Sequence, residues 1–228
     1  MLFTDRGDAG RQLAQHLEHL RGADVTVLGL PRGGVPVAFE VAASLGAPLD
    51  VIVVRKLGVP FEPECAFGAI GEGGARVVDS TIWRTGLTEV EVATVEARAR
   101  AELSRRVRLL RGDRPPAPLD GRTAVIVDDG IATGATARAA CRVARLRGAA
   151  RVVVAAPVGP QDTVASLRHD ADEVICAHVP ASLLAVGEWY ADFTQTTDEE
   201  VRALLDKAAL TRPGPAAGRH PGHPGDRA

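Results

Sequence analysis

The sequence predicts an α/β protein built on a five-stranded, mainly parallel sheet flanked by helices. Two observations predict this class. Short apolar runs rich in valine and isoleucine alternate with helical patterns, and the 228 residues are 46% hydrophobic and 25% charged, the balance of a folded globular protein. Apolar runs bounded by turn residues are typical of strands buried on both faces. Their alternation with helices indicates βαβ units, whose crossover helices cover a parallel sheet.

The predicted elements follow from these patterns. Helices are expected at residues 11–21, 35–45, 88–110, 135–147 and 161–168, and strands at 25–30, 51–54, 124–127, 151–156 and 173–177. The strongest helical pattern is 88–110, because Thr88-Glu89-Val90-Glu91 fits a capping box and its apolar residues fall on one stripe. That stripe should pack on the sheet.

Two further segments complete the predicted organisation. Short strands at 66–70 and 76–78, joined by the glycine-rich residues 71–74, indicate a β-hairpin with a mobile tip. After Leu210 the chain becomes rich in proline and glycine, so residues 211–228 are expected to be a disordered tail that follows a single domain of residues 1–210.

Composition excludes several classes of function. A net charge of −2 without any basic run argues against nucleic-acid binding, which needs a clustered positive surface. The three cysteines, Cys65, Cys141 and Cys176, lack metal-ligand spacing. No stretch approaches the ~20 apolar residues of a membrane span, and the first residues lack the apolar core of a signal peptide. We therefore expect a cytoplasmic protein without a membrane partner.

One loop carries the functional prediction. Asp128 and Asp129 follow the strand at 124–127, at the carboxyl end where open parallel sheets place their ligands. Adjacent carboxylates are tolerated when hydroxyl groups, cations or water-held metal ions satisfy them. The next residues offer backbone N–H groups, two hydroxyls and a helix N-terminus, which together form a phosphate nest; they are Ala132, Thr133, Gly134, Ala135 and Thr136. A ribose 5-phosphate would satisfy both halves.

Residues 124–136 resemble the signature with which type I phosphoribosyltransferases bind 5-phosphoribosyl-1-pyrophosphate (PRPP). The signature consists of four apolar residues, two acids, two further residues and then Ala/Thr-Thr-Gly-x-Thr, and the chain matches it throughout. The resemblance implies that Asp128 and Asp129 hold the ribose hydroxyls, directly or through water on a Mg²⁺ ion, and that residues 132–136 bind the 5-phosphate. It also implies the type I fold, with a hairpin flap and a small hood from about residues 1–20 and 180–205.

Two other positions extend the resemblance. Arg32, Gly33 and Gly34 lie in Leu30-Pro31-Arg32-Gly33-Gly34, which resembles the family's pyrophosphate loop, where a strained or cis peptide is common. An arginine and two glycine amides can wrap a diphosphate. Arg55 and Lys56 are expected to end the second strand and to face the pyrophosphate, because adjacent cations repel unless an anion lies between them. The alternative for this pair is a solvated surface position.

The acceptor is less well defined by the sequence. Trp189, Tyr190 and Asp192 resemble the part of the hood that covers the base in the purine-using branch, where a ring can stack on a heterocycle and an Asp can accept from an amine. Aromatic residues at such a position also commonly close a core. Ala132 stands where hypoxanthine-guanine transferases usually carry an Asp. The acceptor is thus a nitrogenous, purine-like base whose identity the motifs leave open.

Residues 1–205 as a whole resemble a branch of stand-alone phosphoribosyltransferases with Leu-Pro-Arg-Gly-Gly and Arg-Lys-x-Gly motifs. Some relatives carry a fused hydrolase domain, and homodimers are common in the family. The function expected is transfer of ribose 5-phosphate to the base with release of pyrophosphate. The alternative is a PRPP- or nucleotide-sensing regulatory protein of the same fold. A Rossmann oxidoreductase or a serine hydrolase is disfavoured, because Gly-x-Gly-x-x-Gly and Gly-x-Ser-x-Gly are absent from the sequence.

Overall fold

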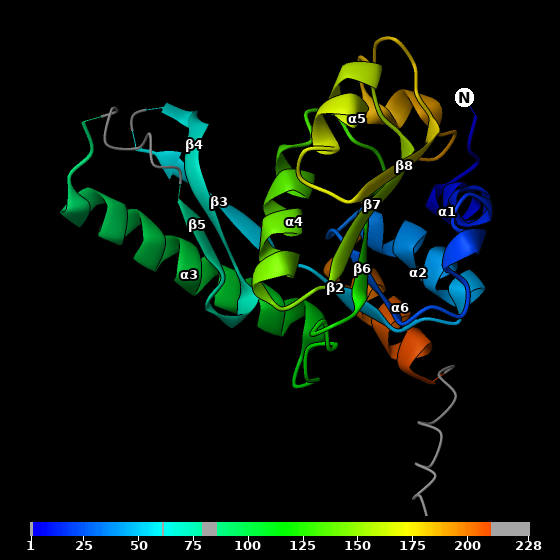
Figure 1. Ribbon diagram of the computed structural model, residues 1–228, viewed down its shortest axis with the longest axis horizontal. Helices are drawn as coiled ribbons and strands as arrows, with labels where there is room; N and C mark the ends of the chain where they lie inside the picture. Colours follow the sequence, from blue (N-terminus) through cyan, green and yellow to red (C-terminus); the bar gives the residue numbers. More distant parts are fainter. Residues whose placement is uncertain (1, 61, 79–85, 211–228) are drawn as a thin grey trace, which may run out of the picture.

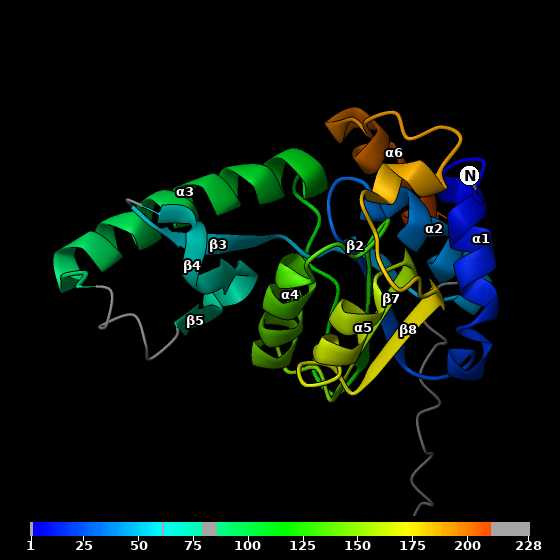
Figure 2. The same ribbon diagram turned by 90° about the horizontal axis from the view of Figure 1, so that it is seen from above.

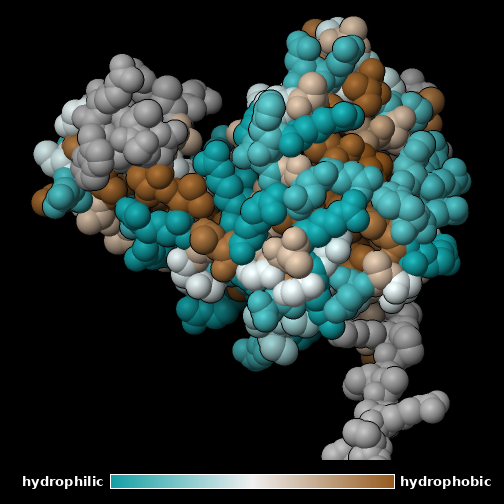
Figure 3. Space-filling view, viewed as in Figure 1, coloured by the Kyte–Doolittle hydropathy of each residue, from teal (hydrophilic) through white to brown (hydrophobic). Residues whose placement is uncertain are grey.

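The computed structural model describes residues 2–60, 62–78 and 86–210, and for residues 62–65 it describes the backbone alone. Figures 1 and 2 show a larger body that contains the parallel sheet, and an arm that projects from one side of it. The surface of the larger body is mostly hydrophilic in the view of Figure 3, while hydrophobic residues show on the arm. The predicted tail, residues 211–228, lies outside the described residues.

The main sheet has five parallel strands in the order β2-β1-β6-β7-β8. These strands are β1 (Val25–Gly29), β2 (Leu49–Val51), β6 (Thr123–Val127), β7 (Arg151–Val158) and β8 (Glu173–His178). The chain runs from β1 to β2 on one side and from β6 through β7 to β8 on the other, so the strand order reverses between β1 and β6. Ligands of open α/β sheets bind at such a switch point, beyond the carboxyl ends of the strands. The predicted five-stranded parallel sheet is confirmed.

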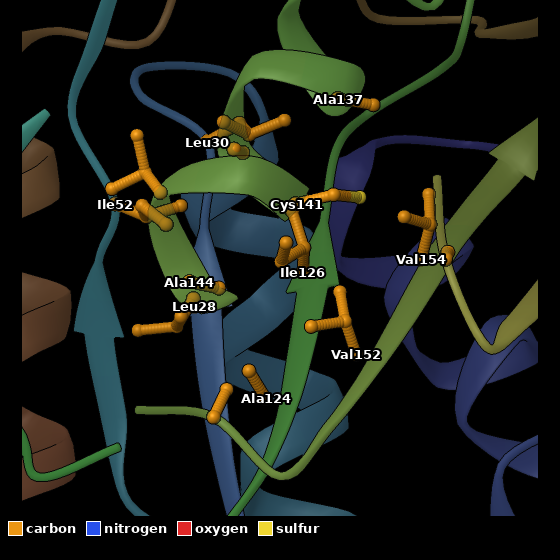
Figure 4. Packing of buried hydrophobic residues seen from close by; sticks show 14 of the residues in the cluster. Leu28, Leu30, Ile52, Ala124, Ile126, Ala137, Cys141, Ala144, Val152 and Val154 are labelled. Carbon is orange, nitrogen blue, oxygen red and sulfur yellow. The ribbon is translucent and has the colours of Figure 1, made fainter. Parts of the chain in front are cut away.

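Helices cover both faces of this sheet, as the alternating pattern predicts. On one face lie α1 (Arg6–Gln15) and α2 (Gly34–Leu45), and on the other lie α4 (Ala135–Leu146) and α5 (Gln161–Leu167). Successive residues of β6 point to opposite faces, so Ile126 packs beneath α4 while Val125 packs beneath α1 and α2. Figure 4 shows Cys141 of α4 in the first of these cores, beside Ile126. Cys141 is thus a buried packing residue, as expected.

The arm consists of a second sheet and a long helix. Its three antiparallel strands are β3 (Val54–Val59), β4 (Glu62–Gly71) and β5 (Arg76–Val78), and its helix is α3 (Glu89–Arg111). The predicted hairpin is confirmed as β4 and β5, and the predicted capping box joins Thr88 and Glu91. The apolar stripe of α3 packs chiefly on the arm's own strands rather than on the parallel sheet, which corrects the expectation from sequence.

The second predicted strand, 51–54, was placed wrongly. β2 ends at Val51, which pairs with Gly29 at the end of β1, and the Ile52 N–H still donates to the Gly29 carbonyl at 3.1 Å. The apolar run continues without a break, but Val54 already belongs to β3 of the arm. Arg55 and Lys56 therefore lie within a strand of the arm and not at the carboxyl end of a strand of the parallel sheet.

The turn between β4 and β5 also differs from its prediction. Residues Glu72–Gly74 form a short 3-10 turn. Glu72 bonds to Arg111 at the end of α3, and the Arg111 Nε lies 2.9 Å from the Asp50 Oδ1 in β2. Arg111 is only 4% exposed. The turn expected to be a mobile tip is thus fastened to the larger body, and this buried ion network joins the arm to the sheet.

The ends of the chain differ most from the predicted elements. Helix α1 begins at Arg6 rather than at residue 11, because Asp5 caps it by accepting from the Asp8 N–H at 2.7 Å. A further helix, α6 (Asp198–Leu210), was not predicted, and it packs against α2 and α3. Thr197 and Glu200 form its capping box. None of the helices in the described ranges has the length and apolar character that spanning a membrane requires.

Candidate functional site

The bend between β6 and α4 lies at the carboxyl edge of the central strand. Backbone bonds to β7 hold the bend in place, since the Asp128 N–H donates to the Ala155 carbonyl at 3.2 Å and the Ile131 N–H donates to the Val158 carbonyl at 2.8 Å. The Ile131 side chain is buried in the core beneath. The bend is therefore anchored at both ends, and its polar groups can face outward.

The predicted phosphate loop forms an open cup. Asp128 and residues 130–137 line a cavity of about 150 Å³ at the N-terminus of α4, several times the ~30 Å³ that one water molecule occupies in the liquid. Gly134 caps the helix with a positive φ of 72°, a conformation that side chains disfavour. Thr133 and Thr136 are exposed. The first N–H groups of a helix lack partners within the helix, so the cup suits a phosphate-sized anion.

The two carboxyl groups beside the cup have different surroundings. Asp129 accepts from the Nε of Arg6 at 2.8 Å, and its side chain is 16% exposed. Asp128 accepts from the Asp129 N–H at 3.0 Å. Burial, together with repulsion from the neighbouring carboxylate, raises the pKa of Asp128 to about 8. An added cation at this point would therefore favour the ionised form of Asp128.

The second predicted loop packs directly on the acidic pair. A Cβ on Gly33 would lie 2.0 Å from the Asp129 Oδ2, and one on Gly34 would lie 2.5 Å from the Val127 carbonyl oxygen, so a larger residue at either position would collide with this site. The peptide bond between Pro31 and Arg32 is cis. The Arg32 guanidinium lies 3.9 Å from Asp198 at the start of α6. The structure thus brings the predicted pyrophosphate loop against the predicted ribose site.

The structure places the predicted cationic pair, Arg55 and Lys56, in strand β3 of the arm. Arg55 forms an ion pair with Glu102 of α3, on the face of β3 that packs against that helix. Lys56, the next residue in the strand, belongs to the opposite face of β3. Val54 lies on that same face and packs on the core beneath α4. The contacts found among the described residues do not join Arg55 or Lys56 to either loop. Their role at the pyrophosphate stays a prediction.

The predicted base-binding residues occupy three different environments. Tyr190 is 2% exposed, and its hydroxyl donates to the Asp129 carbonyl at 2.5 Å. Trp189 is half-buried and stacks on His178 with ring centroids 5.9 Å apart, while Asp192 is exposed and accepts from Thr194. Tyr190 is therefore a buried support of the acidic pair. Contact between any of the three residues and a base stays a prediction.

Sequence reasoning missed two arginines at the site. Arg6 bonds to Asp129, although 123 positions separate them, and no local pattern indicates this contact. Arg138 of α4 donates to the Thr133 carbonyl at 2.9 Å and to Ser166 at 2.8 Å. A basic residue one turn into the helix that follows the phosphate loop is a signal that could have indicated Arg138.

The acidic pair supplies too few ligands to hold a magnesium ion without a bound ligand that adds more. Within the described part of the chain, no group of three or more His, Cys, Asp or Glu side chains gathers in a way that could hold a metal ion. Mg²⁺ commonly keeps several waters and takes one or two carboxylates plus phosphate oxygens from a substrate. Asp128 and Asp129 fit that ligand set, with the remaining oxygens supplied by water and a phosphorylated compound.

The acidic pair, the phosphate cup on the same bend and the glycine loop packed on the acids come from the segments in which the sequence resembles type I phosphoribosyltransferases. No family model matches the sequence. Proteins named "putative phosphoribosyl transferase" from two Mycobacterium tuberculosis strains are each 62% identical to this chain over 208 residues, which cover 91% of this chain and 47% of theirs. A solved structure of a Thermus thermophilus protein is 46% identical, with a TM-score of 0.83 over 91% of this chain and 99% of the other.

Over 91% of its length the chain is thus similar to proteins that are named as phosphoribosyl transferases. It spans about half the length of those two relatives.

Proposed function

We propose that the chain binds PRPP and transfers its ribose 5-phosphate to a nitrogenous, purine-like base, releasing pyrophosphate. The observation that carries this proposal is the contact between the two loops. Gly33 lies so close to Asp129 that a Cβ would overlap its carboxylate, and Asp128, the other acid of the pair, lines the phosphate cup. Sites for pyrophosphate, ribose and 5-phosphate would thus follow one another along the edge of the sheet, in the order of these groups in PRPP.

Each part of the site has a distinct role in this proposal. The cup of residues 132–136 holds the 5-phosphate, and Asp128 and Asp129 accept hydrogen bonds from the ribose hydroxyls. Arg32 and the amides of Gly33 and Gly34 receive the pyrophosphate. A magnesium ion bound with PRPP would neutralise the charge that develops on the departing pyrophosphate.

The reaction replaces one bond of the ribose with another. A nitrogen of the base forms a bond to the anomeric carbon as the carbon–oxygen bond to pyrophosphate breaks, and the electron pair leaves with the pyrophosphate. The ribosyl centre gains positive charge as this bond breaks, and the neighbouring carboxylate of Asp129 stabilises it electrostatically. Exclusion of water matters, since water would otherwise capture this centre.

The proposal also gives roles to two residues of the hood and to the two cations of the arm. Trp189 and Asp192, which lie on either side of the buried Tyr190, are the residues that we expect nearest to the base. Arg55 and Lys56 of the arm would approach the pyrophosphate. A cytoplasmic location and pairing as a homodimer complete the expectation.

The test is a search for product with a panel of bases. The protein is incubated with PRPP, Mg²⁺ and purine, pyrimidine and other nitrogenous bases, and mass spectrometry is used to detect a new nucleotide alongside pyrophosphate. We expect Asp128→Asn combined with Asp129→Asn to abolish turnover while the protein stays folded. Asp113→Asn changes an exposed acid that belongs to neither loop, and it is the matched control. Turnover at the normal rate in the double variant would refute the site assignment.

A second candidate function is a sensor that binds PRPP or a nucleotide without turnover. The Arg6–Asp129 ion pair favours it, because an internal cation already satisfies one oxygen of the acidic pair. Tight binding of PRPP without pyrophosphate release, with every base of the panel, would select this candidate over the enzyme.

A further inference from the structure

One side chain, that of Arg6, joins three separate parts of the site. It is the first residue of α1, yet its Nε lies 2.8 Å from the Asp129 Oδ2 and its Nη1 lies 2.7 Å from the Thr194 carbonyl oxygen. The guanidinium carbon also lies 4.0 Å from the centroid of the Phe193 ring. The N-terminal helix, the acidic pair and the hood segment at 190–194 therefore meet at this residue.

The contacts of Arg6 match the shape of a guanidinium group closely. Two N–H groups donate in different directions within one plane, while the face of that plane covers an aromatic ring. The side chain is only 11% exposed, so little of this interaction is screened by water. A lysine could supply the charge but could not make both hydrogen bonds and the ring contact together.

Two different side chains hold the backbone carbonyl and the carboxylate of Asp129. Tyr190 donates to its carbonyl oxygen and fixes the backbone, while Arg6 donates to Oδ2 and fixes the orientation of the carboxylate. The hydrogen bond from Arg6 uses Oδ2 of this carboxylate. Gly33 leaves room for the carboxylate at the point where Arg6 approaches, because a Cβ there would lie 3.1 Å from the Arg6 Nε.

Arg6 also separates the acidic pair from a neighbouring cavity. This cavity has a volume of about 510 Å³, and Arg6 lines it together with Asp5, Pro36, Asp192 and Glu200. Three of these residues carry carboxyl groups. Removal of the guanidinium would open Asp129 toward a space with further negative charge, so the carboxylate would lose both its donor and its preferred orientation.

We propose that Arg6 is a positioning residue, which orients Asp129 so that one carboxylate oxygen is left for the ligand and which fastens residues 190–194 to the acidic pair. This inference rests on the proposed function, since the ligand in question is the ribose of PRPP. Arg6 acts through Asp129 and does not contact the reacting atoms.

The test compares two ligands in four proteins. Isothermal titration calorimetry with EDTA present, so that Asp129 cannot act through a metal ion, measures the affinity of wild type, Arg6→Gln, Arg6→Lys and Arg11→Gln for PRPP and for inorganic pyrophosphate. Arg11 lies in the same helix, is 59% exposed and pairs with Glu40 at 3.7 Å, so it is the matched control. Pyrophosphate lacks the ribose and therefore does not need an oriented Asp129.

We expect Arg6→Gln to weaken PRPP binding about tenfold or more, the loss that follows from removing one hydrogen bond to a charged group. Arg6→Lys should restore part of this loss, and Arg11→Gln should match wild type. Pyrophosphate affinity should be equal in all four proteins. Wild-type PRPP affinity in Arg6→Gln, or an equal loss for both ligands, would overturn the positioning role.

A ligand-free measurement separates this inference from the proposed function. Hydrogen exchange of the backbone amides at 190–194 should be faster in Arg6→Gln than in Arg11→Gln, while core strands of the two variants exchange alike. If wild type binds no PRPP, the proposed function and the ligand-orienting role both fail, and this exchange experiment decides the anchoring of the hood alone. Equal exchange rates at 190–194 would overturn that anchoring.

Discussion

The raised pKa of Asp128 makes a stability prediction that can be measured without any ligand. The native carboxyl group titrates with a pKa of about 8, because it is buried and lies beside a second carboxylate. In the unfolded chain an Asp titrates near ~3.9. Between these values the native state keeps a proton that the unfolded state has released. The free energy of unfolding therefore falls as the pH rises through this window, and the loss is complete above it.

The loss of unfolding free energy is set by the difference between the native and unfolded pKa of Asp128. That difference, roughly four pH units at ~1.36 kcal/mol each, gives an upper limit of about 5 kcal/mol. Asp128 is only half-buried by surface area and lines an open cavity, so water reduces the effect. We expect about 1–3 kcal/mol. Asp128→Asn has nearly the same shape without the charge, so it should gain stability over wild type by this amount at pH 9.

The assay is urea unfolding of wild type, Asp128→Asn and the control Asp113→Asn between pH 5 and pH 9, followed by circular dichroism. The advantage of Asp128→Asn should grow steadily with pH, and Asp113→Asn should follow wild type. At pH 9, where Asp128 is ionised, the same substitution should weaken PRPP binding about tenfold or more, because a charge-assisted acceptor is lost. A stability difference that stays constant from pH 5 to pH 9 would show that this carboxyl group is not the buried acid described above.

Three other substitutions test the remaining supports of the site. Arg111→Met leaves the buried Asp50 without its ion-pair partner and should lower the free energy of unfolding, measured with urea, by about 3–5 kcal/mol. A loss below about 1 kcal/mol would contradict the stabilising role of this buried ion network. Gly33→Ala should abolish detectable PRPP binding in calorimetry, because its Cβ would overlap the Asp129 carboxylate, and unchanged affinity would contradict this packing. Tyr190→Phe should lower the free energy of unfolding by about 1–2 kcal/mol, because the hydrogen bond to the Asp129 carbonyl is lost. Equal midpoints of thermal unfolding in this variant and in wild type would contradict that role.

The phosphate loop could be predicted from sequence because its parts are consecutive. A buried strand, two acids and a glycine-containing turn into a helix are read from residues 124–136 alone, and the order of strand and helix places the bend at the sheet edge. The parallel sheet was predicted for the same reason. Each apolar run identifies its own strand, and helical spacers between strands require parallel connections.

Two of the predictions that were wrong depend on contacts between distant parts of the chain. Residues 51–54 form one apolar run, but its division between β2 and the arm depends on where the neighbouring strand β1 ends. The turn at Glu72 has the composition of a free tip, yet Arg111, a residue 39 positions later, holds it. Neither fact is visible in the local pattern, because pairing with a distant element decides both.

The sequence alone thus determined the class of the fold and the chemical character of the bend at Asp128, since both follow from patterns of adjacent residues. Tertiary structure alone decided which groups surround that bend. Arg6 and Tyr190 reach Asp129 from opposite ends of the chain, and Gly33 arrives from a different loop. The physical reason is that burial and charge compensation depend on which distant surfaces the packing brings together.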